Sequence, residues 1–265
     1  MSFWLKVFIR ISLRLGNWAF GILQTVGGIS TLLWETLFFI FRPPYRVRET
    51  FRQMKVIGLE TTPLIIVVLA FVGSVVMMEL RYQLMRLIHT VEWVPGFAAI
   101  FMLREAATAV VGAMVASRAG AGMAAEVGSM QITEQVDALR LLRANPVHYL
   151  VVPRFIAGIV MMEVLAMIGV VTGLTFSYLF CMDVHNAMSF IDMARRFTGS
   201  WDLVVVFKKA FFFGMAVPII SCYYGFEAKG GAQGVGIATT KAVVYSILTV
   251  IILDFILTGS EKLVG

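Results

Sequence analysis

Five long apolar runs constrain this chain more than any other feature of its sequence. A helix that crosses a bilayer needs about 20 predominantly apolar residues, and each run comes close to or exceeds that length. Charged residues make up only 14% of the chain and its mean hydropathy is +0.86, whereas a soluble domain carries about 25% charged residues. The runs cover residues 58–78, 94–116, 149–180, 203–224 and 242–258.

These runs predict an all-α integral membrane protein that forms one domain over residues 1–265. Residues 1–57 would form an N-terminal helical region, and residues 58–258 would form a region of five membrane spans. The net charge of +6 comes from cations that flank apolar runs, as in segments next to a membrane. We therefore expect no nucleic-acid partner.

The first forty residues leave two alternatives open. Lys6, Arg10 and Arg14 recur every four positions and so share one face of a helix, which is typical of an amphipathic helix at the membrane surface. Residues 15–41 are apolar enough to cross the bilayer, but they include several polar residues and glycines. They would form either a sixth span or a continuing interfacial helix, and their polar content favours the interfacial helix.

The distribution of lysine and arginine predicts the orientation. Residues 42–55 carry five cations, and cytoplasmic segments next to spans are enriched in such residues. Placing this segment in the cytoplasm makes the first span run outward. The loops at residues 118–147 and 225–241 then also lie in the cytoplasm.

A polar stretch at residues 126–146 interrupts the apolar chain and predicts a short cytoplasmic helix. Ile132, Val136 and Leu139 fall near one helical face, Thr133 is a suitable N-cap, and Pro146 ends the helix. The helix would either close the loop at the protein surface or dock into the groove of a cytoplasmic partner. A connection of this length is more often functional than merely connecting.

Several ionisable residues lie within the apolar runs. Each charge at membrane depth costs about 2.5–3.5 kcal/mol on insertion scales, so such residues are candidates for function. Arg104 and Glu105 are adjacent inside the second run and would form either a binding site or a structural ion pair. Arg154 lies close enough to the cytoplasmic end to extend its charge to water, and Glu163 and Asp254 would pair with cations or helix backbone.

Other patterns point to packing and to the absence of catalysis. Gly112, Ala116 and Gly120 form a ridge of small residues that lets helices approach closely.

The chain lacks the phosphate-loop sequence G-x-x-x-x-G-K-[ST], so any ATP would be hydrolysed with Mg²⁺ in a separate chain. Its three histidines lack the spacing of metal ligands. We expect no catalytic residues, no metal site and no cofactor in this chain.

Three sequence blocks closely resemble the MlaE-type permeases, the membrane subunits of ABC systems that transport phospholipid. The blocks are FMLREAATAVVGAMVASRAG (101–120), SRAGAGMAAEVGSMQITEQVDALRLLRANPVHYLVVPR (117–154) and CYYGFEAKGGAQGVGIATTKAVV (222–244). The resemblance covers about residues 50–260. It implies a homodimeric permease in a bacterial inner membrane, with an interfacial N-terminal helix and five spans in each subunit.

The resemblance also implies partners and site residues. The partners are a cytoplasmic ABC ATPase, a periplasmic MCE-domain protein, a small STAS-domain protein and the phospholipid itself. The implied substrate-binding residues are Arg104, Glu105, Val76, Met77, Tyr82 and Leu84. The polar helix would be the coupling helix that sits in the ATPase, with docking residues Glu126, Ile132, Glu134, Val136, Asp137, Leu139 and Arg140.

Three functions are therefore considered for this chain. The first is a permease subunit that moves phospholipid between the inner membrane and the periplasm or outer membrane. The second is a membrane scaffold that recruits a cytoplasmic partner without transport. A membrane-embedded enzyme is disfavoured, because the polar residues at membrane depth do not converge into an acid–base set.

Overall fold

The chain folds into a long bundle of helices. A computed structural model describes residues 3–43, 45–183 and 186–264; 88% of these residues are helical, and none of them forms a strand. Six helical stretches among these residues are long and apolar enough to cross a membrane. The prediction of an all-α integral membrane protein is confirmed.

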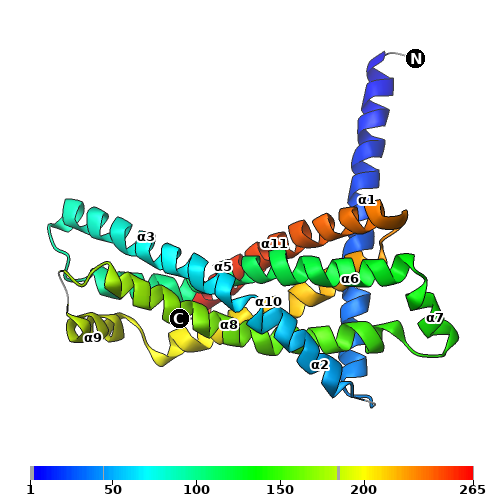
Figure 1. Cartoon of the computed structure of the whole chain (residues 1–265). Helices are drawn as coiled ribbons and strands as arrows, with labels where there is room; N and C mark the ends of the chain where they lie inside the picture. The colour runs from blue at the N-terminus through cyan, green and yellow to red at the C-terminus, as the bar shows by residue number, and fades with distance from the viewer. Residues whose placement is uncertain (1–2, 44, 184–185, 265) are drawn as a thin grey trace.

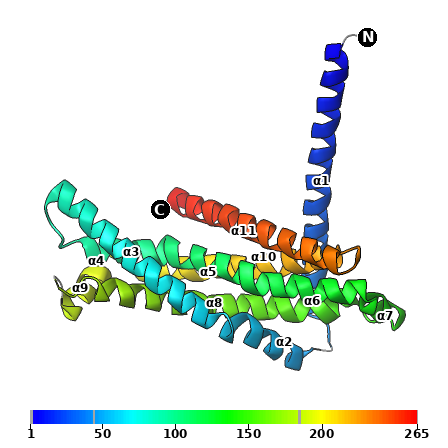
Figure 2. The same ribbon diagram turned by 45° about the horizontal axis from the view of Figure 1, so that its top comes forward.

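Five of these stretches lie side by side and form the bundle (Figures 1 and 2). Several are built from successive helices without a break, because short π-helical turns (η) join α-helical segments. The first stretch contains α2 (Val47–Met54), η1 (Lys55–Leu59) and α3 (Thr62–Ile88). The second contains α4 (Val94–Phe101), η2 (Met102–Ala106), α5 (Ala107–Val115), η3 (Ala116–Gly120) and α6 (Ala121–Ile132). The others are η4 (Val147–Val151) with α8 (Val152–Leu179), α10 (Ser200–Phe226), and α11 (Gly231–Val264).

The sixth stretch belongs to α1 (Phe3–Ile40), which leaves the bundle. This helix crosses the end of the bundle and extends beyond it in both views (Figures 1 and 2), and only 11% of its apolar window at Leu23–Ile40 is buried. A helix that crosses the direction of the spans fits the membrane surface better than a sixth span. The predicted cationic face of Lys6, Arg10 and Arg14 lies outside the side chains that the structure describes.

The short helix α7 (Gln135–Leu141) marks one end of the bundle, and α9 (Ala187–Phe197) marks the other (Figure 1). The prediction of a separate helix over residues 126–146 is wrong in its extent. The second membrane stretch continues to Ile132, and Glu134 then breaks the helix with a left-handed φ of 59°. The continuation is stabilised by packing: a Cβ on Gly128 would lie 3.3 Å from the Cβ of Ala228.

Two further expectations at this end are corrected. Thr133 does not cap α7; its hydroxyl donates to the carbonyl of Ser129 at 2.9 Å and so closes the preceding helix. The expected cytoplasmic loop at residues 225–241 is mostly helix, because α10 ends at Phe226 and α11 begins at Gly231. Since polar residues are compatible with a helix outside the bilayer, the apolar runs mark the spans but not the ends of the helices.

Bare glycines allow the helices of the bundle to touch. A Cβ on Gly73 of α3 would lie only 2.2 Å from the carbonyl oxygen of Gly173 in α8, and the Ser177 hydroxyl donates to the Gly73 carbonyl at 2.9 Å. The predicted small-residue ridge also packs inside this chain: Gly112 faces Phe213 and Val250. These contacts confirm that the ridge is a packing surface.

We predict that Gly73→Ala destabilises the bundle, because the new methyl group would collide with backbone that cannot move independently. Overpacking of this kind costs about 1–3 kcal/mol. Gly122→Ala is the matched control, since a Cβ there would meet no atom of another helix within 4 Å and alanine favours a helix by about 1 kcal/mol over glycine. Thermal unfolding in detergent should show a lower midpoint for Gly73→Ala only; equal midpoints would contradict the close α3–α8 contact.

Candidate functional site

A cavity of about 620 Å³ opens in the half of the bundle nearer α9. Pockets for drug-sized ligands measure about 300–1,000 Å³, so this cavity is large enough for a substantial part of an organic ligand. Its wall combines large apolar side chains with a few polar groups. The lining residues are Leu80, Phe97, Ile100, Phe101, Arg104, Glu105, Trp201, Thr258 and Glu261.

Arg104 is the cation of this cavity, and a buried carboxylate positions it. Its Nε donates to Asp202 Oδ1 at 2.5 Å, and Asp202 Oδ2 accepts from the Gly199 N–H at 2.7 Å in the first turn of α10. The Asp202 side chain is only 5% exposed, whereas that of Arg104 is 42% exposed. Within the described residues the Arg104 Nη groups have no partner. A guanidinium with free donors suits a phosphate or carboxylate.

Glu105 belongs to a second ionic group, centred on Lys209. The Lys209 ammonium has no exposed surface; it donates to Glu105 Oε2 at 2.9 Å and lies 2.9 Å from Asp254 Oδ1. It also donates to the backbone carbonyl of Arg104 at 2.5 Å, and the Thr258 hydroxyl donates to Glu105 at 3.1 Å. The group therefore ties η2, α10 and α11 together directly behind the cavity wall. The expected pairing of Asp254 with a cation is confirmed.

The cavity includes only two of the six substrate-binding residues expected from the sequence. Arg104 and Glu105 line it, but the residue that lines it from α3 is Leu80. Met77 is fully buried and packs with Leu84 in an apolar cluster that Leu80 also joins, and neither Met77 nor Leu84 lines the cavity. The other two expected residues also lie elsewhere: Val76 packs against the main core and Tyr82 is exposed.

The sequence contains a periodic pattern from which more residues of the cavity wall could have been predicted. Phe97, Ile100, Phe101 and Arg104 recur at intervals of three and four residues, so they share one helical face. That face points into the cavity. No comparable signal exists for Trp201, which belongs to another helix and reaches the cavity only through the tertiary fold.

The expected docking face of α7 is also corrected. Val136 is fully buried in the chain and Ile132 and Leu139 are half-buried, so this face packs inward. The exposed apolar residues are Leu141 and Leu142, which are 85% and 78% exposed. The polar residues expected at this site remain at the surface: Glu134 is exposed, and Asp137 pairs with Arg140 at 2.9 Å.

Glu126 lies on α6 rather than α7 and connects three helical stretches. Its carboxylate accepts from Arg52 of α2 at 2.7 Å and from Arg154 of α8 at 2.5 Å. The Arg154 side chain is only 2% exposed and donates to the Leu150 carbonyl at 2.6 Å. The expectation that Arg154 extends to water is therefore wrong, because Glu126 neutralises its charge inside the protein.

Comparisons with known proteins agree on one family. The family model described as Permease MlaE matches residues 50–259, which include the cavity wall from Leu80 to Thr258, the Glu126 group and α7. A probable ABC transporter permease protein of Rickettsia felis is 33% identical over 253 residues, which are 94% of this chain and 97% of that protein.

Two other relatives come from photosynthetic organisms. A probable ABC transporter permease protein of Synechocystis is 34% identical over 213 residues, covering 80% of this chain and 81% of that protein. The Arabidopsis thaliana protein TRIGALACTOSYLDIACYLGLYCEROL 1, chloroplastic, is 34% identical over 214 residues, covering 80% of this chain and 61% of that protein. The similarity thus extends to a plastid protein.

We predict that Lys209→Met strongly destabilises the protein, because it leaves Glu105 and Asp254 without their buried cation. Removing one partner of a buried ion pair costs about 3–5 kcal/mol, whereas replacing the whole group by neutral residues is often tolerated. The triple variant Lys209→Met, Glu105→Gln, Asp254→Asn should therefore recover much of the loss. Unfolding midpoints in detergent test this; a single variant as stable as the parent chain would show that the ionic group does not hold the helices.

Proposed function

The chain belongs to the MlaE permease family, and from this premise we propose that it transports phospholipid between the inner membrane of a bacterium and the periplasm or outer membrane. It is a multi-pass membrane protein and the permease subunit of an ABC transporter, which works with an ATPase partner. Phospholipid is proposed as the substrate because the Arg104 guanidinium has free hydrogen-bond donors in a cavity with an aromatic wall.

The composition of the cavity matches the two parts of a phospholipid. Phe97, Phe101 and Trp201 form apolar walls for an acyl chain, while the Arg104 guanidinium would bind the phosphate. A cavity of 620 Å³ is within the range for drug-sized ligands and holds only part of a diacyl lipid. We propose that a second copy of the chain completes the site, so that the permease acts as a homodimer.

The α7 end is proposed to receive the force of ATP hydrolysis. Leu141 and Leu142 form an exposed apolar surface, which is suited to binding in a groove of the ATPase. Glu126 lies in the last two turns of α6, the helix that precedes α7, and joins α6 to α2 and α8, so a displacement of α7 would move three helices together. This end would face the cytoplasm.

The remaining proposed partners rest on the family resemblance. A periplasmic MCE-domain protein would exchange lipid with the α9 end, and a STAS-domain protein would bind the ATPase in the cytoplasm. A scaffold without transport would use the exposed leucines equally well. A scaffold would not need a cavity in which Asp202 positions Arg104 with free hydrogen-bond donors. The cavity therefore favours the transport function.

We predict that Arg104→Ala lowers phospholipid transport about tenfold, the effect of losing one charge-assisted hydrogen bond to the substrate. Arg104→Lys should retain intermediate activity, because lysine keeps the charge but loses the planar donor pair. The measurement is ATP-driven transfer of labelled phospholipid by the assembled complex in vesicles. Arg81→Ala is the matched control, since Arg81 pairs with Asp183 and does not line the cavity. Transport at the parent level by assembled Arg104→Ala complex would refute the assignment.

We predict that Leu141→Asp combined with Leu142→Asp abolishes lipid-stimulated ATP hydrolysis. Two carboxylates would be unfavourable in an apolar groove, yet the bundle should stay folded because both side chains are exposed. The double methionine variant at the same positions is the control, because it keeps apolar surface and should remain active. If lipid still stimulates ATP hydrolysis in the aspartate variant, the ATPase binds another surface of this chain.

A further inference from the structure

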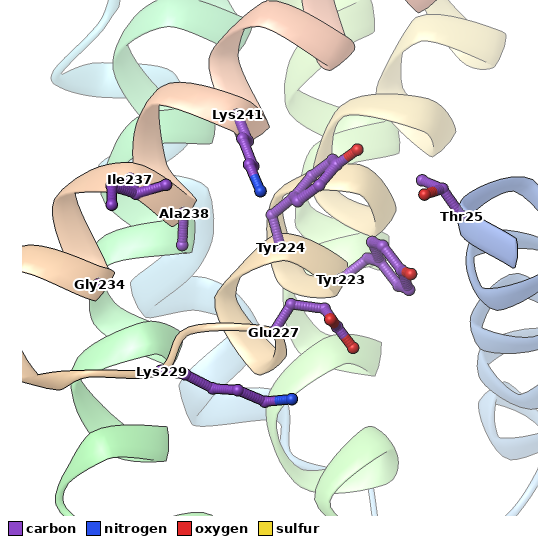
Figure 3. A pocket seen from close by; sticks show the side chains of 9 residues that line it. All are labelled: Thr25, Tyr223, Tyr224, Glu227, Lys229, Gly234, Ile237, Ala238 and Lys241. Atoms are coloured by element: carbon purple, nitrogen blue, oxygen red, sulfur yellow. The ribbon is translucent and has the colours of Figure 1, made fainter. Parts of the chain in front are cut away.

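A second cavity, of about 280 Å³, lies at the α7 end, between α1, the end of α10 and the first turns of α11 (Figure 3). It is separate from the cavity that contains Arg104, with which it shares no residue. Its wall contains two cations, one carboxylate and two phenol rings. The lining residues are Thr25, Tyr223, Tyr224, Glu227, Lys229, Gly234, Ile237, Ala238 and Lys241.

The charged groups of this cavity are not neutralised by the protein. Lys241 reaches in from α11 with its ammonium beside Tyr224, while Glu227 and Lys229 extend into the opposite part of the same space (Figure 3). Over the described residues, none of these three side chains belongs to an ion pair. The cavity therefore offers both positive and negative charge to a ligand.

The aromatic wall is held in place by packing on both sides. Tyr224 stacks on Tyr245 with ring centroids 5.1 Å apart, and Tyr223 meets Tyr224 edge-on at 5.3 Å. On the other side Tyr223 lies against the bare backbone of Gly28 in α1, where a Cβ would approach the ring to 2.6 Å. The rings thus form a fixed surface, and aromatic faces attract organic ammonium groups.

The loop between α10 and α11 is also fixed. Gly230 and Gly231 adopt left-handed φ values of 86° and 73°, which glycine adopts without the strain of a side chain. A Cβ on Gly234 would lie 1.7 Å from the Lys229 carbonyl oxygen, so only glycine lets the loop pack on the helix. These glycines keep Lys229 at the edge of the cavity.

We propose that this cavity binds the headgroup of a zwitterionic phospholipid, a phosphodiester that carries an ammonium group. Lys241 would bind the phosphate beside Tyr224, with Lys229 adding positive charge at the edge of the cavity, and the Glu227 carboxylate with the tyrosine rings would bind the ammonium. The volume of 280 Å³ is just below the range for drug-sized ligands, about 300–1,000 Å³, which suits a headgroup rather than a whole lipid. The cavity lies where α1 crosses the bundle, at the membrane surface in the arrangement proposed above.

This site goes beyond the transport function and does not require it. A headgroup bound between α1 and α11 would anchor the crossing helix to the bundle and to the inner leaflet. The two sites are at opposite ends of the protein, so they can be tested separately. Loss of the headgroup site should leave Arg104-dependent transport measurable, and Arg104→Ala should leave the headgroup site intact.

The test places a photoreactive benzoylphenylalanine at Ile237, which lines the cavity and is 52% exposed. The full chain is reconstituted in vesicles of equal parts phosphatidylethanolamine and phosphatidylglycerol, and lipid adducts are identified by mass spectrometry. We expect phosphatidylethanolamine adducts to predominate. Lys229→Gln with Lys241→Gln should lower them about tenfold, and Glu227→Gln should abolish the preference for phosphatidylethanolamine.

Arg48→Gln with Lys55→Gln is the matched control. It removes two exposed cations from the same end of the protein but none from the cavity, so the adducts should persist. The same probe at Phe255, which is 79% exposed elsewhere on α11, should react equally in all variants and so report correct insertion. Equal loss in the control, or equal adducts of both lipids in the parent chain, would overturn the proposal. If millimolar inorganic phosphate or free phosphoethanolamine, added before irradiation, prevents formation of the adduct, the cavity binds a soluble ligand and the proposal is overturned.

Discussion

The fully buried ammonium of Lys209 fixes the half of the bundle that contains the cavity. An isolated charge at this depth would cost several kcal/mol, and it is tolerated because Glu105, Asp254 and the Arg104 carbonyl surround it. These partners come from η2 and α11, so the helices satisfy the charge only in this arrangement. Because Lys209 binds the backbone carbonyl of Arg104 while Asp202 binds its Nε, Arg104 is held at both its backbone and its side chain. The stabilising group and the cavity are therefore one structural unit.

π-helical turns occur where the bundle holds several of its polar contacts. The η2 turn contains Arg104 and Glu105, and the η3 turn contains Arg118, which donates to the Val56 carbonyl and to Thr61 near the start of α3. A π-turn adds one residue to a helical turn and is frequent at functional sites. It shifts the phase of the side chains that follow, so one long helix can present an apolar face in one half and polar contacts in another.

The sequence predicted the spans well because their cause is local: a bilayer requires a minimum apolar length, and five runs meet it. It predicted the helix ends poorly. Glu126 and Gly234 look unsuited to a membrane helix, yet both are helical because the helices continue beyond the apolar runs. Arg104 and Glu105 were correctly selected as candidates by their depth. Their partners were not predictable, because Asp202 is 98 residues from Arg104 along the chain. Adjacent residues of opposite charge suggested one ion pair, whereas the fold separates them into two groups.

The continuity of the second membrane stretch explains how events at α7 could reach the cavity. Residues Val94–Ile132 form one helical stretch of 39 residues, which at 1.5 Å per residue is about 58 Å long. One end carries Phe97, Phe101 and Arg104 of the cavity wall, and the other carries Glu126 in the last two turns of α6, before α7. Glu126 binds α2 and α8 at that end, while Glu105 binds Lys209 of α10 near the other. A force on α7 would thus act on one continuous helical stretch. Ion pairs near both ends of this stretch attach it to the neighbouring helices. In the proposed cycle these attachments, rather than the apolar contacts between them, determine which helices move together.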